Sequence, residues 1–282
     1  MKTSYLKFII RAFSLLSVIP SVNLFAVALG QEVLKKEDLS LQKVQNEKIL
    51  KVCSDAGFLP FEMKNLKGDW MGFDIDMMKE YSKFLSVELK MIQISFDGII
   101  PALISGKCDM IAAGMTVTPE RKAMVLFSDS TFISGLSIAI KNNEKNKSEY
   151  KDLNSLDKKG NKIAVKTGYT SDIFLSKTLK NAQLLKFDQD SDLVLAVLQG
   201  RANAFVSDST YIDLMDKGNK NKFIILPTKI VSDSFSVAGR KDDFELMKNF
   251  NMFLKQWKGN GGYNKAKKYY FEDQIWRSQV AN

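Results

Sequence analysis

The chain has 282 residues, of which 45% are hydrophobic and 26% are charged, and its formal net charge at pH 7 is +9. These values are typical of a globular protein with one large or two medium domains, and they exclude a disordered or fibrous chain. The sequence contains no histidine, which excludes histidine-based catalytic triads and histidine metal sites.

The N-terminal residues have the pattern of an export signal. Basic residues precede an apolar stretch that Pro20 and Asn23 interrupt, and the stretch ends in small residues. We predict a signal peptide at residues 1–30, removed by cleavage after Gly30 or, as an alternative, after Ala28. The protein is then expected in the periplasm. A retained membrane anchor is the other interpretation, but the stretch is short and broken for a spanning helix.

Short apolar runs alternate with helical periodicity after a polar lead-in segment predicted at residues 31–45. This alternation is typical of an α/β protein. In the first half we expect helices at 73–86, 97–105 and from 119 onward, and strands at 49–54, 87–94, 109–114 and 136–141. In the second half we expect helices at 171–180, 190–200, 209–216, 242–257 and 261–271, and strands at 162–168, 182–187, 203–207, 223–226 and 234–239. Two such series in one chain suggest two lobes.

The stretch "TVTPER" explains where one helix begins. Thr118 is a good N-cap and Pro119 falls at the first helical position, where its missing N–H costs nothing. Glu120 suits the positive end of the helix dipole, whereas Arg121 opposes it by up to about 1 kcal/mol. The charge of Arg121 is therefore either solvated or placed beside an anion.

Two further features concern the lysines and the cysteines. The lysine-rich run at residues 141–162 is interrupted by acidic residues and asparagines, which predicts a solvated loop rather than a nucleic-acid surface. If Cys53 and Cys108 lie on neighbouring parallel strands, they are about 13 Å out of register. That separation exceeds the reach of a disulfide, so we predict two buried free thiols.

Ligands of open α/β sheets bind outside the carboxyl ends of the strands. The loops expected to carry function are therefore those after Cys53, Ala113, Val165 and Val206. These loops contain Asp55, Thr116, Gly168, Thr170 and Asp208.

Six stretches stand in the order found in one known family. They are "SDAGFLPFE" (54–62), "GFDIDMMKEYSKFL" (72–85), "FDGIIPALISGKCDMIAAGMTVTPER" (96–121), "FSDSTF" (127–132), "KIAVKTGYTS" (162–171) and "LQGRANAFVSDS" (198–209). From about residue 46 to its end, the chain resembles periplasmic amino-acid-binding proteins of ABC transporters (polar amino acid uptake family, solute-binding protein family 3). It departs from the family pattern at Ser130, Phe96 and Gly168-Tyr169-Thr170, where proline, tryptophan and Gly-Thr-Thr or Gly-Thr-Gly are common.

This resemblance implies an α/β fold with two lobes, the type II periplasmic-binding-protein fold. Each lobe would be a mixed sheet flanked by helices, and two hinge strands, in 134–141 and 230–240, would join the lobes. Lobe 1 is expected at residues 46–137 plus 232–282, and lobe 2 at residues 138–231. One continuous α/β domain is the alternative.

The resemblance also implies a site for a free amino acid. Arg121 would bind the ligand carboxylate through its planar guanidinium, helped by Thr116 and by backbone N–H groups near Gly114. Asp208 would bind the ammonium group, although by itself it could be only a helix cap. The expected ligand-binding residues are Asp55, Phe58, Phe96, Ala113, Gly114, Thr116, Arg121, Lys166, Gly168, Tyr169, Thr170 and Asp208. No catalytic residue, metal or cofactor is expected.

The residues near the ligand side chain leave its identity open. Phe58 and Phe96 would stack on its apolar stem, although either could be ordinary core. Asp55 and Lys166 together could hydrogen-bond a neutral amide, which favours a glutamine-like ligand. If Lys166 points away, Asp55 alone favours a cationic ligand. The remaining alternative is that Asp55 caps a turn and Lys166 is solvated.

The expected function is capture of a polar amino acid and its delivery to an ABC permease, by a monomer that binds no nucleic acid. Two alternatives use the same fold. One is a dehydratase-like enzyme, for which Glu62 is the nearest general acid, and the other is a sensory amino-acid-binding module.

Overall fold

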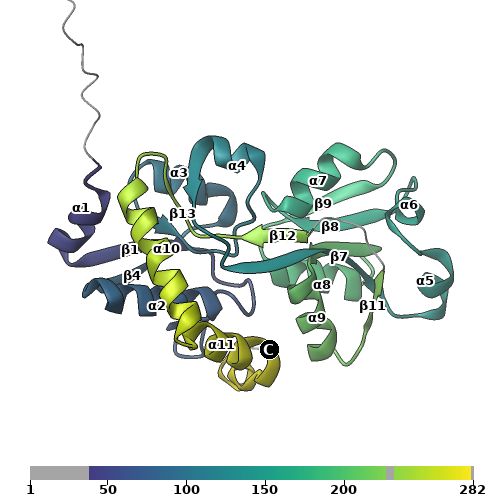
Figure 1. Ribbon diagram of the computed structural model, residues 1–282. Coiled ribbons are helices and arrows are strands. Elements are labelled where there is room, and N and C mark those ends of the chain that lie inside the picture. Colours follow the sequence, from purple (N-terminus) through teal and green to yellow (C-terminus); the bar gives the residue numbers. More distant parts are fainter. Residues whose placement is uncertain (1–37, 227–231, 281–282) are drawn as a thin grey trace, which may run out of the picture. The chain divides into compact units, whose positions relative to one another are not determined.

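The structure, a computed structural model, describes residues 38–226 and 232–280 (Figure 1). The predicted signal peptide lies outside the described residues. The predicted lead-in is only partly described, and its end is not a plain segment, because Ser40–Glu47 form helix α1. Val44 of α1 is 1% exposed, so this helix is attached to the fold by an apolar contact.

The first sheet has five strands in the order β4-β1-β5-β13-β6. Strand β1 is parallel to β4 and β5, and β13 is antiparallel to β5 and β6. The strands are β1 (Ile49–Ser54), β4 (Glu88–Gln93), β5 (Met110–Ile111), β6 (Val125–Phe127) and β13 (Ala238–Arg240), and a separate hairpin pairs β2 (Met63–Lys64) with β3 (Trp70–Met71). The accompanying helical segments are α2 (Phe73–Leu85), η1 (Phe96–Gly98), α3 (Ile99–Ile104), α4 (Pro119–Met124), α10 (Phe244–Gly259), α11 (Gly262–Lys267), η2 (Lys268–Asp273) and η3 (Ile275–Gln279).

The second sheet has six strands, in the order β11-β7-β10-β8-β9 with β12 paired to β7. Its strands are β7 (Phe132–Lys141), β8 (Lys162–Lys166), β9 (Gln183–Phe187), β10 (Ala204–Asp208), β11 (Phe223–Leu226) and β12 (Ser232–Phe235). Its helices are α5 (Glu144–Glu149), α6 (Leu153–Leu156), α7 (Thr170–Thr178), α8 (Asp190–Leu198) and α9 (Ser209–Gly218). The lysine-rich run, expected to be a loop, therefore contains α5 and α6, and α5 has no buried residue.

Two strands connect the two sheets, as the resemblance implies. The first four residues of β7 pair antiparallel with β12, and the rest of β7 pairs with β10 and β11 of the second sheet. Strand β12 leads into β13, which belongs to the first sheet. Figure 1 shows β7 and β12 side by side at this crossing. The fold is the expected mixed α/β arrangement with two lobes, each built on its own sheet.

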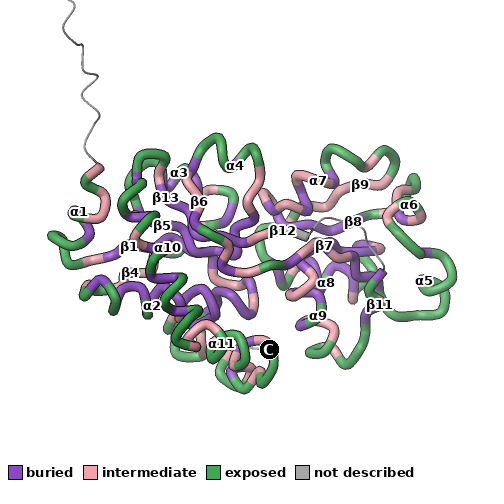
Figure 2. Tube along the Cα trace, in the orientation of Figure 1, coloured by how far each residue is buried: buried purple, intermediate pink, exposed green. Residues whose placement is uncertain are grey.

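The buried core follows the strands of both sheets and includes the residues around the crossing of β7 and β12. Figure 2 shows buried residues along both sheets and exposed ones on α5. At the crossing, Phe132 of β7 and Phe235 of β12 pack against Phe61, with ring centroids 5.0 and 5.2 Å from that ring. Aromatic rings at such distances add to the energy of apolar burial, so this cluster stabilises the crossing.

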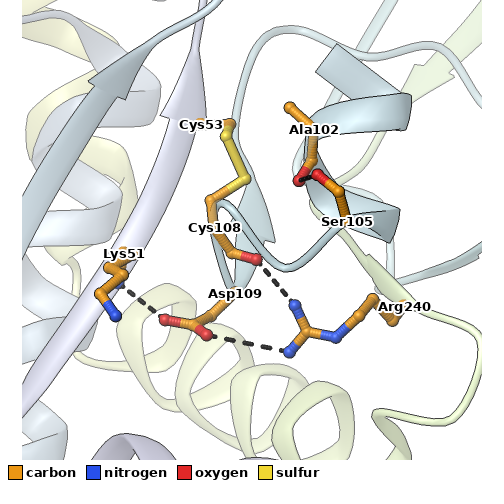
Figure 3. The surroundings of a disulfide bond; sticks show 7 residues. All are labelled: Lys51, Cys53, Ala102, Ser105, Cys108, Asp109 and Arg240. Carbon is orange, nitrogen blue, oxygen red and sulfur yellow. Dashed lines mark hydrogen bonds and ion pairs between the residues drawn. A yellow bond between two sulfur atoms is a disulfide. The ribbon is translucent and has the colours of Figure 1, made fainter. Parts of the chain in front are cut away.

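The prediction of two free thiols is wrong, because Cys53 and Cys108 form a disulfide (Figure 3). The prediction treated Cys108 as part of the strand, but β5 begins only at Met110, which pairs with Val52. Cys108 precedes the strand, so the straight-strand estimate does not apply to it. The two Cα atoms are 5.7 Å apart, which is within disulfide reach.

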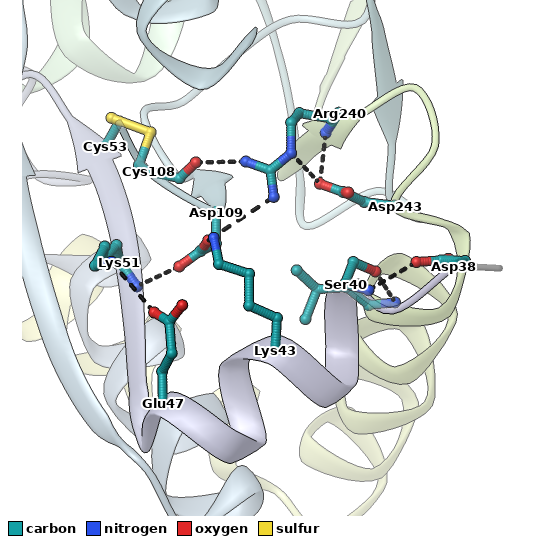
Figure 4. Close-up of polar contacts among 11 residues, drawn as sticks. Asp38, Ser40, Lys43, Glu47, Lys51, Cys53, Cys108, Asp109, Arg240 and Asp243 are labelled. Atoms are coloured by element: carbon teal, nitrogen blue, oxygen red, sulfur yellow. Dashed lines mark hydrogen bonds and ion pairs between the residues drawn. A yellow bond between two sulfur atoms is a disulfide. The ribbon is translucent and has the colours of Figure 1, made fainter. Parts of the chain in front are cut away.

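Polar contacts hold the segment that carries Cys108 (Figure 4). Arg240 donates from its Nη1 to the carbonyl oxygen of Cys108 at 2.7 Å. The buried carboxylate of Asp109 accepts the backbone N–H of Lys51 at 3.0 Å and lies 3.4 Å from Nζ of Lys43 on α1. The contact of Asp109 with Lys43 also attaches α1 to the first sheet.

Candidate functional site

The loop after β5 approaches an aromatic ring so closely that only glycine fits. Gly114 has φ +51°, and a Cβ there would lie 2.5 Å from Cε1 of Phe58. The N–H of Gly114 donates to Oδ2 of Asp74 at 2.9 Å, and Ala113 beside it is buried. The backbone of this loop is therefore held against Phe58 by the absence of a side chain and by one carboxylate.

Arg121 lies on helix α4, which begins as predicted. Oγ1 of Thr118 accepts the backbone N–H of Arg121, and Pro119 is the first helical residue. The guanidinium of Arg121 is buried and donates to the carbonyl oxygens of Thr116 at 2.8 Å and Gly168 at 3.0 Å. Thr116 precedes α4 in the first lobe, whereas Gly168 follows β8 of the second. The charge of Arg121 is therefore located where the two lobes meet.

Lys166, at the end of β8, is also buried, with 2% of its surface exposed. Its ammonium group lies 2.8 Å from Oδ2 of Asp55 and 2.7 Å from Oδ2 of Asp190, and it donates to the hydroxyl of Tyr169 at 3.1 Å. Burial lowers the pKa of Lys166, but the charges of Asp190 and Asp55 outweigh burial, and the net shift is upward. Lys166 is therefore a charged member of a buried network and not a solvated side chain.

Two aromatic rings lie between Arg121 and Lys166. The guanidinium carbon of Arg121 is 5.1 Å from the ring centroid of Phe96, and that ring is 4.4 Å from the ring of Tyr169. Nζ of Lys166 is in turn 4.6 Å from the centroid of Tyr169. Phe58 meets Tyr169 edge to face at 5.7 Å. The expected aromatic residues are thus brought together with both cations, and each cation is within cation–π distance of a ring.

Asp208 is the last residue of β10 and occupies the N-cap position of α9, without a capping hydrogen bond from its side chain. Burial raises the pKa of Tyr169, and the negative charges of Asp190, Glu62, Asp55 and Asp208 raise it further. The charge of Asp208 therefore acts on the cluster around Tyr169. Thr170 begins α7 immediately after this tyrosine.

Three buried acids of the site were not among the expected ligand-binding residues. Asp190 is 1% exposed, and burial raises its pKa while Lys166 opposes the shift. Glu62 is fully buried, and burial and Asp74 raise its pKa well above the usual range. Burial likewise raises the pKa of Asp74 to about 7.

One signal in the sequence could have identified Asp190. It follows β9, which is parallel to β8 with Phe187 opposite Lys166, so the rule about carboxyl ends of strands applies to it as well. Glu62 immediately precedes β2, and Asp74 lies in the first turn of α2. The rule gives no indication for either position, and only the packing around Phe58 and Gly114 brings these two acids to the site.

The described residues contain no group of three or more acidic or cysteine side chains arranged to hold a metal ion. Within the same residues, every helix is too short or too polar to cross a membrane.

The two lobes, the paired crossing strands and the buried charges between the lobes define a class, the two-lobed α/β binding proteins with the type II periplasmic-binding-protein fold. Residues 50–273 match the family of bacterial extracellular solute-binding proteins, family 3. The chain belongs to this family.

Its relatives have names that refer to amino acids. A probable histidine-binding protein of Neisseria gonorrhoeae is 32% identical over 230 residues, which are 79% of this chain and 83% of that protein. An L-arginine-binding protein of Pseudomonas aeruginosa is 29% identical over 85% of this chain and 94% of its own length. A glutamine-binding protein of Bacillus subtilis is 31% identical over 85% of this chain and 86% of that protein.

Solved structures similar to this chain are also described as amino-acid-binding proteins. A mutant of ArgBP from T. maritima has a TM-score of 0.78 and 33% identity, covering 83% of this chain and 100% of its own. An ancestral amino-acid-binding protein, described as a precursor of cyclohexadienyl dehydratase, has a TM-score of 0.78 and 34% identity over the same shares.

Proposed function

We propose that this protein captures a free polar L-amino acid between its two lobes and delivers it to an ABC permease in the membrane. The observation that carries the proposal is the buried guanidinium of Arg121, which contacts Thr116 in the first lobe and Gly168 in the second. A bidentate donor at this position suits a carboxylate, and Asp208 supplies the opposite charge for the ammonium group. The names of the relatives support an amino acid as ligand.

In this proposal, lobe 1 comprises residues 46–137 plus 232–282, and lobe 2 residues 138–231. The ligand binds the closed arrangement of the lobes better than the open one and so shifts their equilibrium. The permease binds the closed arrangement, in which the surfaces of the two lobes have a fixed position relative to each other. The protein acts as a periplasmic monomer after removal of residues 1–30. The side chain of the ligand is either glutamine-like, as the pairing of Asp55 with Lys166 suggests, or cationic.

The test is a thermal-shift screen of the purified protein against the twenty amino acids. A ligand at about 100 times its dissociation constant should stabilise the fold by about 2.7 kcal/mol. Arg121→Lys should weaken binding at least about tenfold, because lysine lacks the planar pair of donors. The control is Lys122→Gln, which removes the cation at the position after Arg121, where the side chain is exposed. No response to any amino acid would refute the proposal, and full affinity in Arg121→Lys would refute the assignment of the ligand carboxylate to Arg121.

A second function is favoured by one observation. Glu62 is buried, and its carboxyl oxygens have no hydrogen-bond partner among the described residues, which is an environment suited to a general acid. The likeness to a precursor of cyclohexadienyl dehydratase supports a dehydratase-like activity. Turnover of prephenate or arogenate, lost in Glu62→Gln, would establish this activity, and absence of turnover would exclude it for these substrates.

A further inference from the structure

The ammonium group of Lys166 has no donor left for a ligand. A lysine ammonium carries three N–H donors, and those of Lys166 are directed to Oδ2 of Asp55, Oδ2 of Asp190 and the hydroxyl of Tyr169. A side-chain amide of a ligand would need one of these donors for its carbonyl oxygen. Because all three are engaged inside the protein, Lys166 does not act as the donor in side-chain recognition.

An acceptor does remain in the same cluster. Oδ1 of Asp190 is buried and has no hydrogen-bond partner among the residues that the structure describes. A buried carboxylate oxygen without a donor carries a substantial desolvation cost. Asp190 is also the first residue of α8, where the helix dipole favours its ionised form. The cluster therefore offers a buried carboxylate oxygen that needs a donor.

The charges in the cluster do not cancel. Asp55 and Asp190 carry two negative charges, and Lys166 between them carries one positive charge. The ion pairs thus leave an excess of about one negative charge in a buried environment, where charges interact more strongly than in water. A cationic group of a ligand would neutralise this excess, whereas a neutral amide would leave it in place.

The cluster lies at the far end of an aromatic path that starts at Arg121. The rings of Phe96 and Tyr169 separate the guanidinium of Arg121 from the ammonium group of Lys166. The side chain of an amino acid held by its carboxylate at Arg121 would extend toward Asp190 along these rings. Aromatic faces suit the apolar stem of such a side chain and its cationic end.

We propose that Asp190 is a specificity-determining residue that accepts a hydrogen bond from a cationic group at the end of the ligand side chain. Lys166 is then a positioning residue that holds Asp55 and Asp190 together and gives no contact to the ligand. The ligand is an amino acid with an extended cationic side chain rather than a glutamine-like one. This inference rests on the proposed function and names the ligand class of the same site.

The test compares L-arginine with L-citrulline, which has the same length but a neutral end group. Calorimetric titration of the purified protein should give at least about tenfold tighter binding of arginine, since hydrogen bonds between charged groups are the stronger ones. In Asp190→Asn this ratio should fall about tenfold, mainly through weaker arginine binding. The control is Asp192→Asn, two residues further along the first turn of α8, which should leave the ratio unchanged.

A second variant keeps the test decisive if Asp190→Asn does not fold. Lys166→Met leaves both carboxylates without their internal cation, so the ratio of arginine to citrulline affinity should rise several-fold. An unchanged ratio in either variant, provided that the variant folds, would overturn the inference, as would equal binding of the two ligands by the wild-type protein. In those cases binding of an amino acid would still stand, whereas failure of the wild-type protein to bind any amino acid would refute the proposed function and this inference together.

Discussion

The disulfide between Cys53 and Cys108 provides a quantitative prediction about stability. The bond closes a loop with a sequence separation of 55 residues. Restricting the unfolded chain over a loop of this length is worth about 4 kcal/mol in the chain-entropy model. Both cysteines are fully buried, so the bond is part of the core of the first lobe. We therefore expect Cys53→Ala/Cys108→Ala to lose about 4 kcal/mol of unfolding free energy.

Urea unfolding followed by circular dichroism measures this loss. Cys108→Ala alone should lose nearly as much as the double variant, because either change removes the same bond and the effects of bonded partners are not additive. Thiol titration of the unfolded wild-type protein should find no free thiol before reduction and two after it. Additive effects of the two single variants, or two free thiols without reductant, would refute the reasoning.

Two other predictions concern Gly114 and Asp74. Gly114→Ala should lower the free energy of unfolding by about 2–5 kcal/mol in urea, because the new Cβ would lie 2.5 Å from Phe58 and the residue has a φ of +51°. A decrease below about 1 kcal/mol would contradict this packing. Burial raises the pKa of Asp74 from 3.8 to about 7, so between these values the folded protein retains a proton that the unfolded chain releases, and stability falls as pH rises. Asp74→Asn should remove up to about 4 kcal/mol of this decline in unfolding curves measured from pH 4 to 7, and parallel curves for the two proteins would count against it.

The surroundings of Lys166 depend on residues that are far away in the sequence. Asp55 and Lys166, expected to bind the ligand side chain together, form an ion pair with each other, although they are more than a hundred residues apart in the sequence. The third member, Asp190, is not among the residues predicted from the sequence, although it follows β9, the neighbour of the strand that ends at Lys166. Strand order places these residues together, and strand order is decided by packing over the whole domain.

Elements with local causes could be predicted from the sequence. The alternation of apolar runs predicted most strands and helices, Thr118 and Pro119 predicted the start of α4, and the ordered motifs predicted the two-lobed fold. Three features became visible only in the folded protein: the disulfide, the helix at the end of the lead-in, and the three partners that occupy the donors of Lys166. A cap or a periodicity depends on neighbours within one turn, whereas these contacts depend on where loops end in space, which no short stretch of the sequence determines.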